Sequence, residues 1–559
     1  MSNSKPIQIE EFSIDQLLNF IKDNHVAIPA FQRGFVWSKN DIISLFDSLN
    51  KNYPIGSFVI WKTKSKMEEL RYLFTENNKK GGEKYLVIDG QQRLISLYYL
   101  CEAGAFDNKK ESFSEIDENA HSIDFNKFRP VDEKERKEDK NHVLKFYNKT
   151  PEDKIDNAKI KRLIDKDYRF PVITVSLISD EAIKAFEKIN DTGTPVSVDA
   201  IFLANVWKKL SFGKILRDWK KKEKQDKTSC AGIRNILIIH TFELVYQIEN
   251  GYKKENINMS GRRLREIAAS IHDANDSENR PNKKMFEDVL KAIKNAMKFL
   301  EQHIKINKVE ELPYPTMLSM LGIFFYYKER PNDTQKIEIL KWFWRSSLNN
   351  RYSGSNYNKS TKDDPYMFYE LANDNKKLKV EDIKEKDLKK DLEKTNMHGG
   401  GRSGLRKAVE LMLWIKGPTS MDGSILDKKA SHRSEKKEND HFYPHKFSKD
   451  GLIKGEINSI LNLCYLKDSE NNAQKKSKHP FDWIKSDLEQ IAPKNPNIKL
   501  KKFFDTHLLP YKSLDDLKKK SKPDHHGTTY DHAYTQFKKA RSELFVKILT
   551  KLQKKGEII

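Results

Sequence analysis

Cysteine is scarce in this sequence: its 559 residues include only three, Cys101, Cys230 and Cys464. They lie far apart and form no C-x-x-C pair, which excludes the usual zinc-knuckle and dithiol redox motifs. So few cysteines fit a reducing compartment, and we expect a cytoplasmic protein without structural disulfides.

Targeting signals and long apolar runs are also lacking. The N-terminal stretch MSNSKPIQIEEF has no basic segment followed by an apolar one, so we expect no signal peptide. The most apolar long run, residues 314–327, is interrupted by Thr316, Ser319 and Gly322 and is too short to span a bilayer. We expect no membrane partner and interpret this run as a buried helix.

Acidic residues are outnumbered by basic ones. The chain has 81 Asp and Glu against 103 Lys and Arg, a formal net charge of +22. Residues 501–559 alone contain 14 Lys or Arg and 7 Asp or Glu, which favours a localised basic face. Such a field attracts a polyanion and favours nucleic acid, here double-stranded DNA, as the partner. Alternatively, the excess of basic residues reflects only a lysine-rich surface exposed to solvent.

The length and the apolar patterns predict a multi-domain α/β (α+β) protein. Residues 1–210 mix helical spacings with β-branched runs such as SFVIW and RFPVITVSLI, and include a polar insertion at 104–165. Residues 211–400 form a predominantly helical spacer that ends in a polar linker, 351–400, with the glycines of HGGGRSG. Residues 401–559 form the last domain, which opens with the helix LRKAVELMLWIKG.

The stretch YLVIDGQQRLISLYYL places five polar or small residues where a β-type run becomes a helical pattern: Asp89, Gly90, Gln91, Gln92 and Arg93. At a helix start, backbone N–H groups and the helix dipole favour an anion. Arg93 can offer a forked donor to phosphate, and the two glutamines can bond base, sugar or phosphate edges. Asp89 could hold a divalent ion or orient Arg93. Alternatively, Asp89 and Arg93 merely pair and cap the helix.

Two more stretches accompany this one. IPAFQRGFVW carries Gln32 and Arg33 between apolar anchors, and FEKINDTGTP offers Asn190 and Thr192 on a glycine turn. The three motifs in this order resemble the N-terminal domain of the GmrSD-type, modification-dependent (type IV) restriction endonucleases, which has a ParB/sulfiredoxin-like core. The resemblance covers about residues 8–210.

This resemblance implies a domain that binds and hydrolyses a nucleotide, GTP or ATP, and couples its turnover to DNA sensing. Residues 89–93 would bind the nucleotide, and Gln32 and Arg33 would sense DNA or its modification. The chain has no G-x-x-x-x-G-K-[ST] motif, so hydrolysis would use chemistry other than that of a P-loop.

A second constellation lies near the C-terminus, around DHFYPH. A one-metal nuclease needs oxygen ligands for a hard cation, a base that activates water and a group that holds the base. An imidazole, here His441, takes a proton from water near neutral pH. Adjacent residues on a strand point to opposite sides, so Asp440 could bind metal while His441 faces the water. Asn471 would supply a second oxygen ligand, and Asn462 could fix the imidazole through a side-chain or backbone bond.

This combination resembles the HNH, or ββα-metal, nuclease motif at the C-terminus of the same family, over about residues 400–555, including the late helix FKKARSELFVKILTKL. The resemblance implies Mg²⁺ or a similar divalent cation. The last metal ligand of the family motif can be aligned with this sequence in two ways that differ by one residue, so Asn472 remains an alternative to Asn471. His445 and His479 flank the motif and are expected to be solvated surface histidines.

Together the resemblances imply an anti-phage DNA endonuclease in which nucleotide binding or hydrolysis gates metal-dependent cleavage or nicking. Whether the chain forms a homodimer stays open. One alternative is a phosphorothioate-sensing NTPase-nickase of the SspE type. Another, from a different class, is a basic nucleic-acid-binding NTPase switch without nuclease activity.

Overall fold

A computed structural model describes most of the chain. The residues described are 7–23, 26–29, 37, 41, 44–45, 48–49, 51–63, 70–72, 84–102, 168–176, 181, 198–206, 209–398, 403–428, 437–467, 478–491, 494–523 and 529–557. The chain divides into two compact units. Unit 1 consists of residues 1–226, 234–239 and 260–287, and unit 2 of residues 227–233, 240–259 and 288–559. The domain boundaries expected at 210 and 400 stay predictions.

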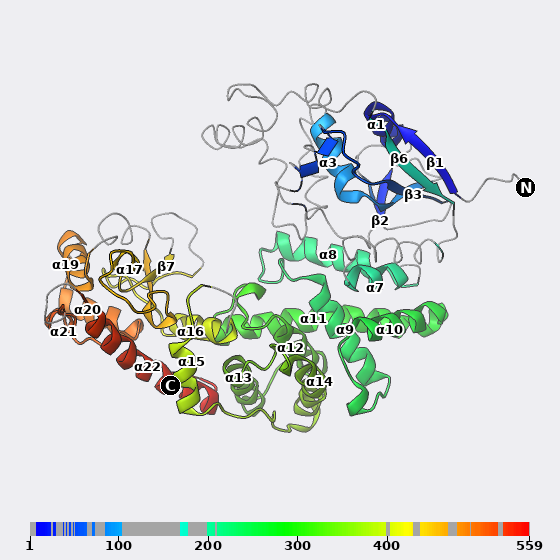
Figure 1. The fold of residues 1–559 in the computed structure, drawn as a ribbon. Coiled ribbons are helices and arrows are strands. Elements are labelled where there is room, and N and C mark those ends of the chain that lie inside the picture. The colour runs from blue at the N-terminus through cyan, green and yellow to red at the C-terminus, as the bar shows by residue number, and fades with distance from the viewer. Residues whose placement is uncertain are drawn as a thin grey trace, which may run out of the picture. The chain divides into compact units, whose positions relative to one another are not determined.

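Unit 1 contains a mixed sheet, which has six strands in the described residues, in the order β1-β6-β3-β5-β2-β4. Figure 1 labels four of these strands, β1, β2, β3 and β6. Neighbours β1 and β6, β3 and β5, and β2 and β4 are antiparallel, whereas β6 and β3, and β5 and β2, are parallel. The predicted strands SFVIW and RFPVITVSLI are confirmed as β3 and β6. The strands are β1 Ile7–Phe12, β2 Ala27–Pro29, β3 Phe58–Thr63, β4 Leu70–Tyr72, β5 Lys84–Asp89 and β6 Phe170–Val175.

The sheet forms because its inner strands are apolar on both faces. Four successive residues of β3, Phe58 to Trp61, are buried, as expected for a strand with a partner on each edge and cover on each face. Phe58 and Ile60 point to one face, where they join a core with helices α1 (Ile14–Asp23) and α3 (Gln91–Glu102). Burying each large apolar side chain contributes about 1.5–3 kcal/mol.

Helices complete unit 1: α7 (Val198–Val206), α8 (Phe212–Gln225) and α10 (Gly261–Asp273), with the first turns of α11 (Asp276–Ile304). α7 packs against α10. Phe212 at the start of α8 stacks on Phe286 of α11, with ring centroids 4.0 Å apart. The helical character predicted for residues 211–400 is confirmed here in α8 and α11.

Unit 2 is largely helical. The apolar run interpreted as a buried helix is α12 (Thr316–Tyr327), in which every residue from Met317 to Phe325 is buried. It packs against α14 (Asn356–Asp374), and α13 (Asp333–Leu348) begins with a capping box formed by Asn332 and Gln335. Among the described residues, no helix has the length and apolar character needed to cross a membrane.

The polar linker expected at 351–400 is corrected by the structure, which forms two helices there, α14 and α15 (Glu385–Glu393). Polar residues of this segment take part in the packing of the helices. The buried carboxylate of Asp364 accepts bonds from Arg351 Nε at 3.0 Å and Trp342 Nε1 at 3.2 Å. Phe368 and Leu371 on the same helix are fully buried. In the sequence, an aspartate such as Asp364 indicates a polar, exposed position. When several donors satisfy its carboxylate, however, it can be buried in a packed core.

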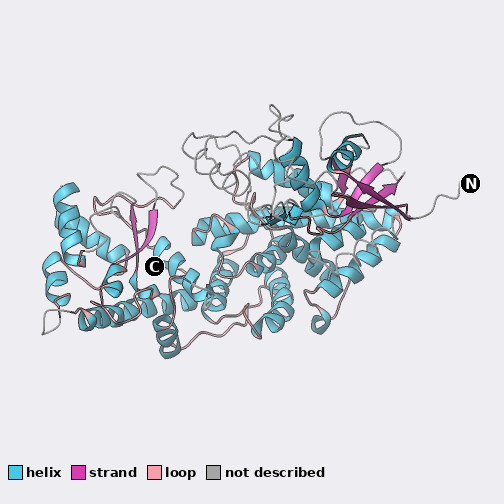
Figure 2. Ribbon diagram, turned by 45° about the horizontal axis from the view of Figure 1, so that its top comes forward, coloured by secondary structure: helices cyan, strands magenta, loops and turns pink. Residues whose placement is uncertain are grey.

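The C-terminal part of unit 2 surrounds a small hairpin, the pair of magenta strands at the left of Figure 2. β7 (Lys437–His441) and β8 (Leu463–Lys467) are antiparallel. An aromatic core packs behind them and includes Phe442, Tyr443 and Trp483. The surrounding helices are α16 (Ser403–Ile415), α17 (Lys446–Lys449), α19 (Pro480–Ile491), α20 (Pro496–Thr506), α21 (Leu514–Lys520) and α22 (Asp531–Lys555). The predicted opening and closing helices are confirmed as α16 and α22.

A buried arginine fastens α22 to the hairpin. Arg541 is fully buried and donates to the carbonyl oxygens of Leu461 at 2.6 Å and His507 at 2.8 Å. His507 Nε2 lies 3.0 Å from the carbonyl oxygen of Tyr465 in β8. Burial lowers the pKa of the Arg541 guanidinium to about 10, so the group stays charged near neutral pH. The closing helix thus supports the backbone that precedes and forms β8.

Candidate functional site

The predicted strand-to-helix junction in unit 1 is confirmed. β5 ends at Asp89, and α3 begins at Gln91. Gly90 between them has a φ of +89°, a conformation that side-chain-bearing residues rarely adopt. A Cβ atom at this position would also lie 2.5 Å from Cδ1 of Phe58. Glycine is therefore required at the turn that brings the DGQQR residues together.

Arg93 is held by groups of the protein itself. Its Nη2 atom donates to Asp89 Oδ2 and to the carbonyl oxygen of Ser57, each at 3.0 Å, and Nη1 donates to the carbonyl oxygen of Ile55. The guanidinium also lies over the ring of Phe58, 5.3 Å from its centroid. Burial lowers the pKa of Arg93, and the Asp89 carboxylate acts in the opposite direction. The pairing of Asp89 with Arg93 that the sequence left open is present.

Through these hydrogen bonds, Arg93 holds the backbone of the loop that precedes β3. Tyr168 holds the same loop, because its hydroxyl donates to the carbonyl oxygen of Tyr53 at 2.9 Å and accepts from Ile55 N at 3.3 Å. Gly56 allows the close approach, since a Cβ atom there would lie 2.5 Å from Nη1 of Arg93. The first effect of the Arg93 side chain is therefore to fix the loop's backbone beside the helix start.

The two glutamines of the motif are nearly buried, each with 7% of its surface exposed. Gln92 Oε1 accepts a hydrogen bond from the backbone N–H of Trp37 at 3.3 Å, which ties α3 to the end of the IPAFQRGFVW stretch. Gln32 and Arg33 of that stretch lie outside the described residues, as do Asn190, Thr192 and the insertion at 104–165. Their sensing roles stay predictions.

In unit 2, His441 ends β7, with 9% of its surface exposed. Its Nε2 atom lies 2.9 Å from Oδ1 of Asn458. An amide oxygen only accepts hydrogen bonds, so Nε2 carries the proton. In the neutral imidazole the lone pair then resides on Nδ1, the atom that can take a proton from water. Asn458 thus favours the tautomer that carries its proton on Nε2.

Asn462 holds the backbone that follows His441. Its fully buried amide accepts from Tyr443 N at 2.8 Å and donates to the carbonyl oxygens of Tyr443 at 2.9 Å and Ile457 at 3.0 Å. Its own carbonyl oxygen accepts from Phe442 N at 2.7 Å. These bonds join the exit of β7 to the turn before β8. In the contacts described, Asn462 therefore bonds backbone groups and Asn458 bonds the imidazole, so the role predicted for Asn462 in fixing the imidazole stays a prediction.

Sequence reasoning missed Asn458. It lies in the turn KGEINS, four residues before Asn462, and no residue pattern distinguishes it from other loop asparagines. Its position is set by tertiary contacts, because its backbone carbonyl accepts from Met397 N at 2.7 Å.

Two more imidazoles face His441. The His445 ring lies 5.5 Å from it and the His398 ring 6.4 Å, centroid to centroid. Both are exposed. His479, by contrast, does not match the solvated histidine expected: its ring stacks on Tyr530 at 4.8 Å, and burial lowers its pKa to about 4.

The metal ligands stay predictions. The backbone of Asp440 pairs with that of Cys464, which confirms the expected strand, but its side chain and residues 471–472 lie outside the described part of the protein. Among the side chains described, no group of three or more His, Cys, Asp or Glu is placed to hold a metal ion. The described part of the site thus contains the imidazole of His441 and the two asparagines that hold it and its backbone.

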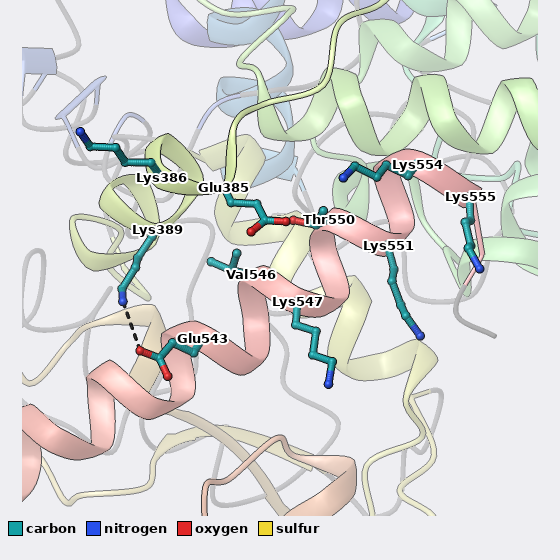
Figure 3. Close-up of a pocket in the computed structure, with 10 residues that line it drawn as sticks. All are labelled: Glu385, Lys386, Lys389, Glu543, Val546, Lys547, Thr550, Lys551, Lys554 and Lys555. Atoms are coloured by element: carbon teal, nitrogen blue, oxygen red, sulfur yellow. Dashed lines mark hydrogen bonds and ion pairs between the residues drawn. The ribbon is translucent and has the colours of Figure 1, made fainter.

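A lysine-lined groove runs between α15 and α22 (Figure 3). Its cavity is about 670 Å³, and Val546 and Thr550 form its apolar part. Glu543 pairs with Lys389 across it at 3.3 Å. Two glutamates, Glu385 and Glu543, line the groove against six lysines, so basic groups outnumber acidic ones. The lysines that line it are Lys386, Lys389, Lys547, Lys551, Lys554 and Lys555. Four of them belong to the basic C-terminal stretch identified in the sequence.

Comparison with known proteins gives two results. Residues 14–207 match the family model described as GmrSD restriction endonuclease, N-terminal domain. An uncharacterized protein of Methanocaldococcus jannaschii is 24% identical over 524 residues, covering 85% of this chain and 87% of that protein. The likeness to this relative thus extends well beyond residue 207. The family match makes residues 14–207 similar to the N-terminal domain of the GmrSD restriction endonucleases.

Proposed function

We propose that this protein is an HNH-type, metal-dependent DNA endonuclease whose cutting is gated by nucleotide turnover and by DNA modification. The observation that carries the proposal is the orientation of His441 by Asn458, which prepares an imidazole for general-base work. The family match supports it independently, because it points to a restriction endonuclease through a different part of the chain.

In the proposed reaction, His441 Nδ1 takes a proton from water while the water oxygen attacks phosphorus. The bond from phosphorus to the leaving oxygen breaks in line with the attack. Asn458 keeps the imidazole oriented during the proton transfer, and Asn462 keeps the backbone beside it fixed. A Mg²⁺-class ion held by Asp440 and Asn471, or Asn472, would polarise the phosphate and stabilise the leaving oxygen.

For unit 1 we propose a ParB/sulfiredoxin-like nucleotide site at residues 89–93. The start of α3 offers backbone N–H groups and a dipole that favour phosphate. Because Arg93 is engaged with Asp89 and the loop at 55–57, its contribution is to position this loop, and a nucleotide would compete with or extend those contacts. Gln32 and Arg33 would sense the DNA.

The lysine-lined groove is proposed to hold the DNA backbone. Lysines on two helices, α15 and α22, present several positive charges over a short distance, and phosphate contacts of this kind give affinity without reading sequence.

The test is cleavage of matched plasmids that are unmodified, base-modified or phosphorothioated, each with and without NTP and Mg²⁺. Metal-dependent strand breaks that respond to NTP and to one modification support the proposal. Triggering by phosphorothioate alone would assign the protein to the sulfur-sensing type. NTP turnover without strand breaks under any condition would reject the endonuclease and leave a nucleic-acid-binding switch.

A further inference from the structure

His398 comes to the hairpin from a distant part of the chain. It follows α15 and precedes the glycines of HGGGRSG, 43 residues before His441 in the sequence. The segment that carries it pairs with the turn before β8. Ile460 N donates to the carbonyl oxygen of Thr395 at 2.8 Å, Met397 N donates to that of Asn458 at 2.7 Å, and Asn396 forms a bridge with Ser459.

Asn458 connects the two histidines. Its carbonyl oxygen holds the backbone of Met397, directly before His398, and its side chain holds the imidazole of His441. One residue thereby fixes both the base and the segment that presents the second imidazole. The side chain of His398 is exposed, so packing is not the reason for its position.

The separation of the two rings suits a shared substrate group. Two nitrogens that each hydrogen-bond to one group between them lie about 5–6 Å apart, which the 6.4 Å between centroids accommodates. His441 is committed to the attacking water. A second imidazole 6.4 Å from it would therefore lie close enough to bond an oxygen of the phosphate that the water attacks.

We propose that His398 is a phosphate-contacting residue of the nuclease site, donating a hydrogen bond to a non-bridging oxygen of the scissile phosphate. This inference rests on the proposed endonuclease function. It makes the segment 395–398, which the sequence suggested to be part of a linker, a component of the site. No bond to His398 forms or breaks; the residue orients the phosphate and offsets its charge.

The test is the single-turnover rate of plasmid nicking with Mg²⁺, measured on full-length protein. His398→Ala should lower the rate about 10- to 100-fold, with unchanged thermal unfolding and unchanged DNA affinity in the presence of Ca²⁺. His398→Gln, which keeps an N–H donor, and added imidazole should each restore part of the rate in a way that a structural role would not allow. His272→Ala, at a partly exposed histidine of unit 1, is the control.

The outcomes separate the two proposals. Nicking by the wild type and its loss in His441→Ala establish the endonuclease whatever His398 does. A wild-type rate in His398→Ala, or a loss that neither glutamine nor imidazole relieves, then overturns the inference alone. A wild-type protein that never nicks overturns the proposed function, and the role of His398 with it.

Discussion

Nε2 of His441 donates a hydrogen bond to Oδ1 of Asn458 at 2.9 Å, which joins the end of β7 to the turn before β8. Asn462, four residues later, bonds only to backbone groups through its side chain in the contacts described. The two asparagines therefore have different roles: Asn458 orients the imidazole, and Asn462 fixes the backbone beside it.

This division predicts different effects for two similar substitutions. Asn458→Ala removes the acceptor that orients the imidazole and should slow nicking about tenfold or more, with a loss of unfolding free energy of about 1 kcal/mol. Asn462→Ala leaves three buried backbone groups without partners and should cost about 3 kcal/mol or more. Denaturant unfolding and single-turnover nicking measure both. Wild-type nicking by Asn458→Ala would contradict the orienting role.

Arg93→Ala should loosen the loop at 55–57 and lower NTP turnover. The guanidinium holds two backbone carbonyl groups and Asp89, and its loss should reduce the unfolding free energy by about 2 kcal/mol. Arg93→Lys keeps the charge but has no fork to bridge the same groups, so it should resemble alanine. An NTPase rate in Arg93→Ala equal to that of the wild type would reject a role of Arg93 at the nucleotide.

Acid should destabilise unit 2 through His507. Burial lowers the pKa of this histidine from its ordinary 6.5 to about 4 in the folded protein. Between these values the unfolded chain binds a proton that the folded protein does not, so stability falls as the pH drops from about 6.5 towards 4. From pH 7 to pH 5 the contribution is about 2 kcal/mol.

His507→Gln should flatten this dependence, because glutamine does not titrate. The measurement is the unfolding midpoint of the wild type and the variant across pH 7 to 5, with the slope compared rather than the absolute stability. His479, whose pKa burial also lowers to about 4, contributes in the same direction and remains in both proteins. Equal slopes in the two proteins would show that His507 has no depressed pKa.

Reversing charge in the groove should weaken DNA binding in a salt-dependent way. Lys547→Glu with Lys551→Glu removes two phosphate contacts, so the slope of log affinity against log salt should become about 1.8 units shallower. Lys359→Glu with Lys362→Glu changes the same charge on the exposed side of α14 and serves as the control. Equal losses in both double variants would show a general charge effect and no groove.

Local patterns sufficed for several elements. Strands β3 and β6, the junction at Gly90 and helices α16 and α22 each leave a period or a turn residue in the sequence, because neighbours along the chain determine them. The strand that the roles suggested for Asp440 and His441 required is present as β7. The ParB-like and HNH assignments, the metal ligands and the domain boundaries stay predictions.

What the sequence could not predict depends on contacts between distant segments. Arg93 looked like a phosphate donor, since nothing near it in sequence shows that the carbonyl groups of Ile55 and Ser57 would take its N–H groups. Helix α14 looked like a linker because the buried partners of Asp364 are not its sequence neighbours along the helix. His398 and Asn458 meet only through the pairing of segments about 60 residues apart.

The most direct test of the endonuclease is nicking of supercoiled plasmid with Mg²⁺ by the wild type and by His441→Ala. The predicted result is conversion to open circle by the wild type, none above background by the variant, and equal DNA affinity and unfolding midpoints for the two. Equal nicking by the variant would contradict the assignment of His441 as the base and, with it, the mechanism proposed for this protein.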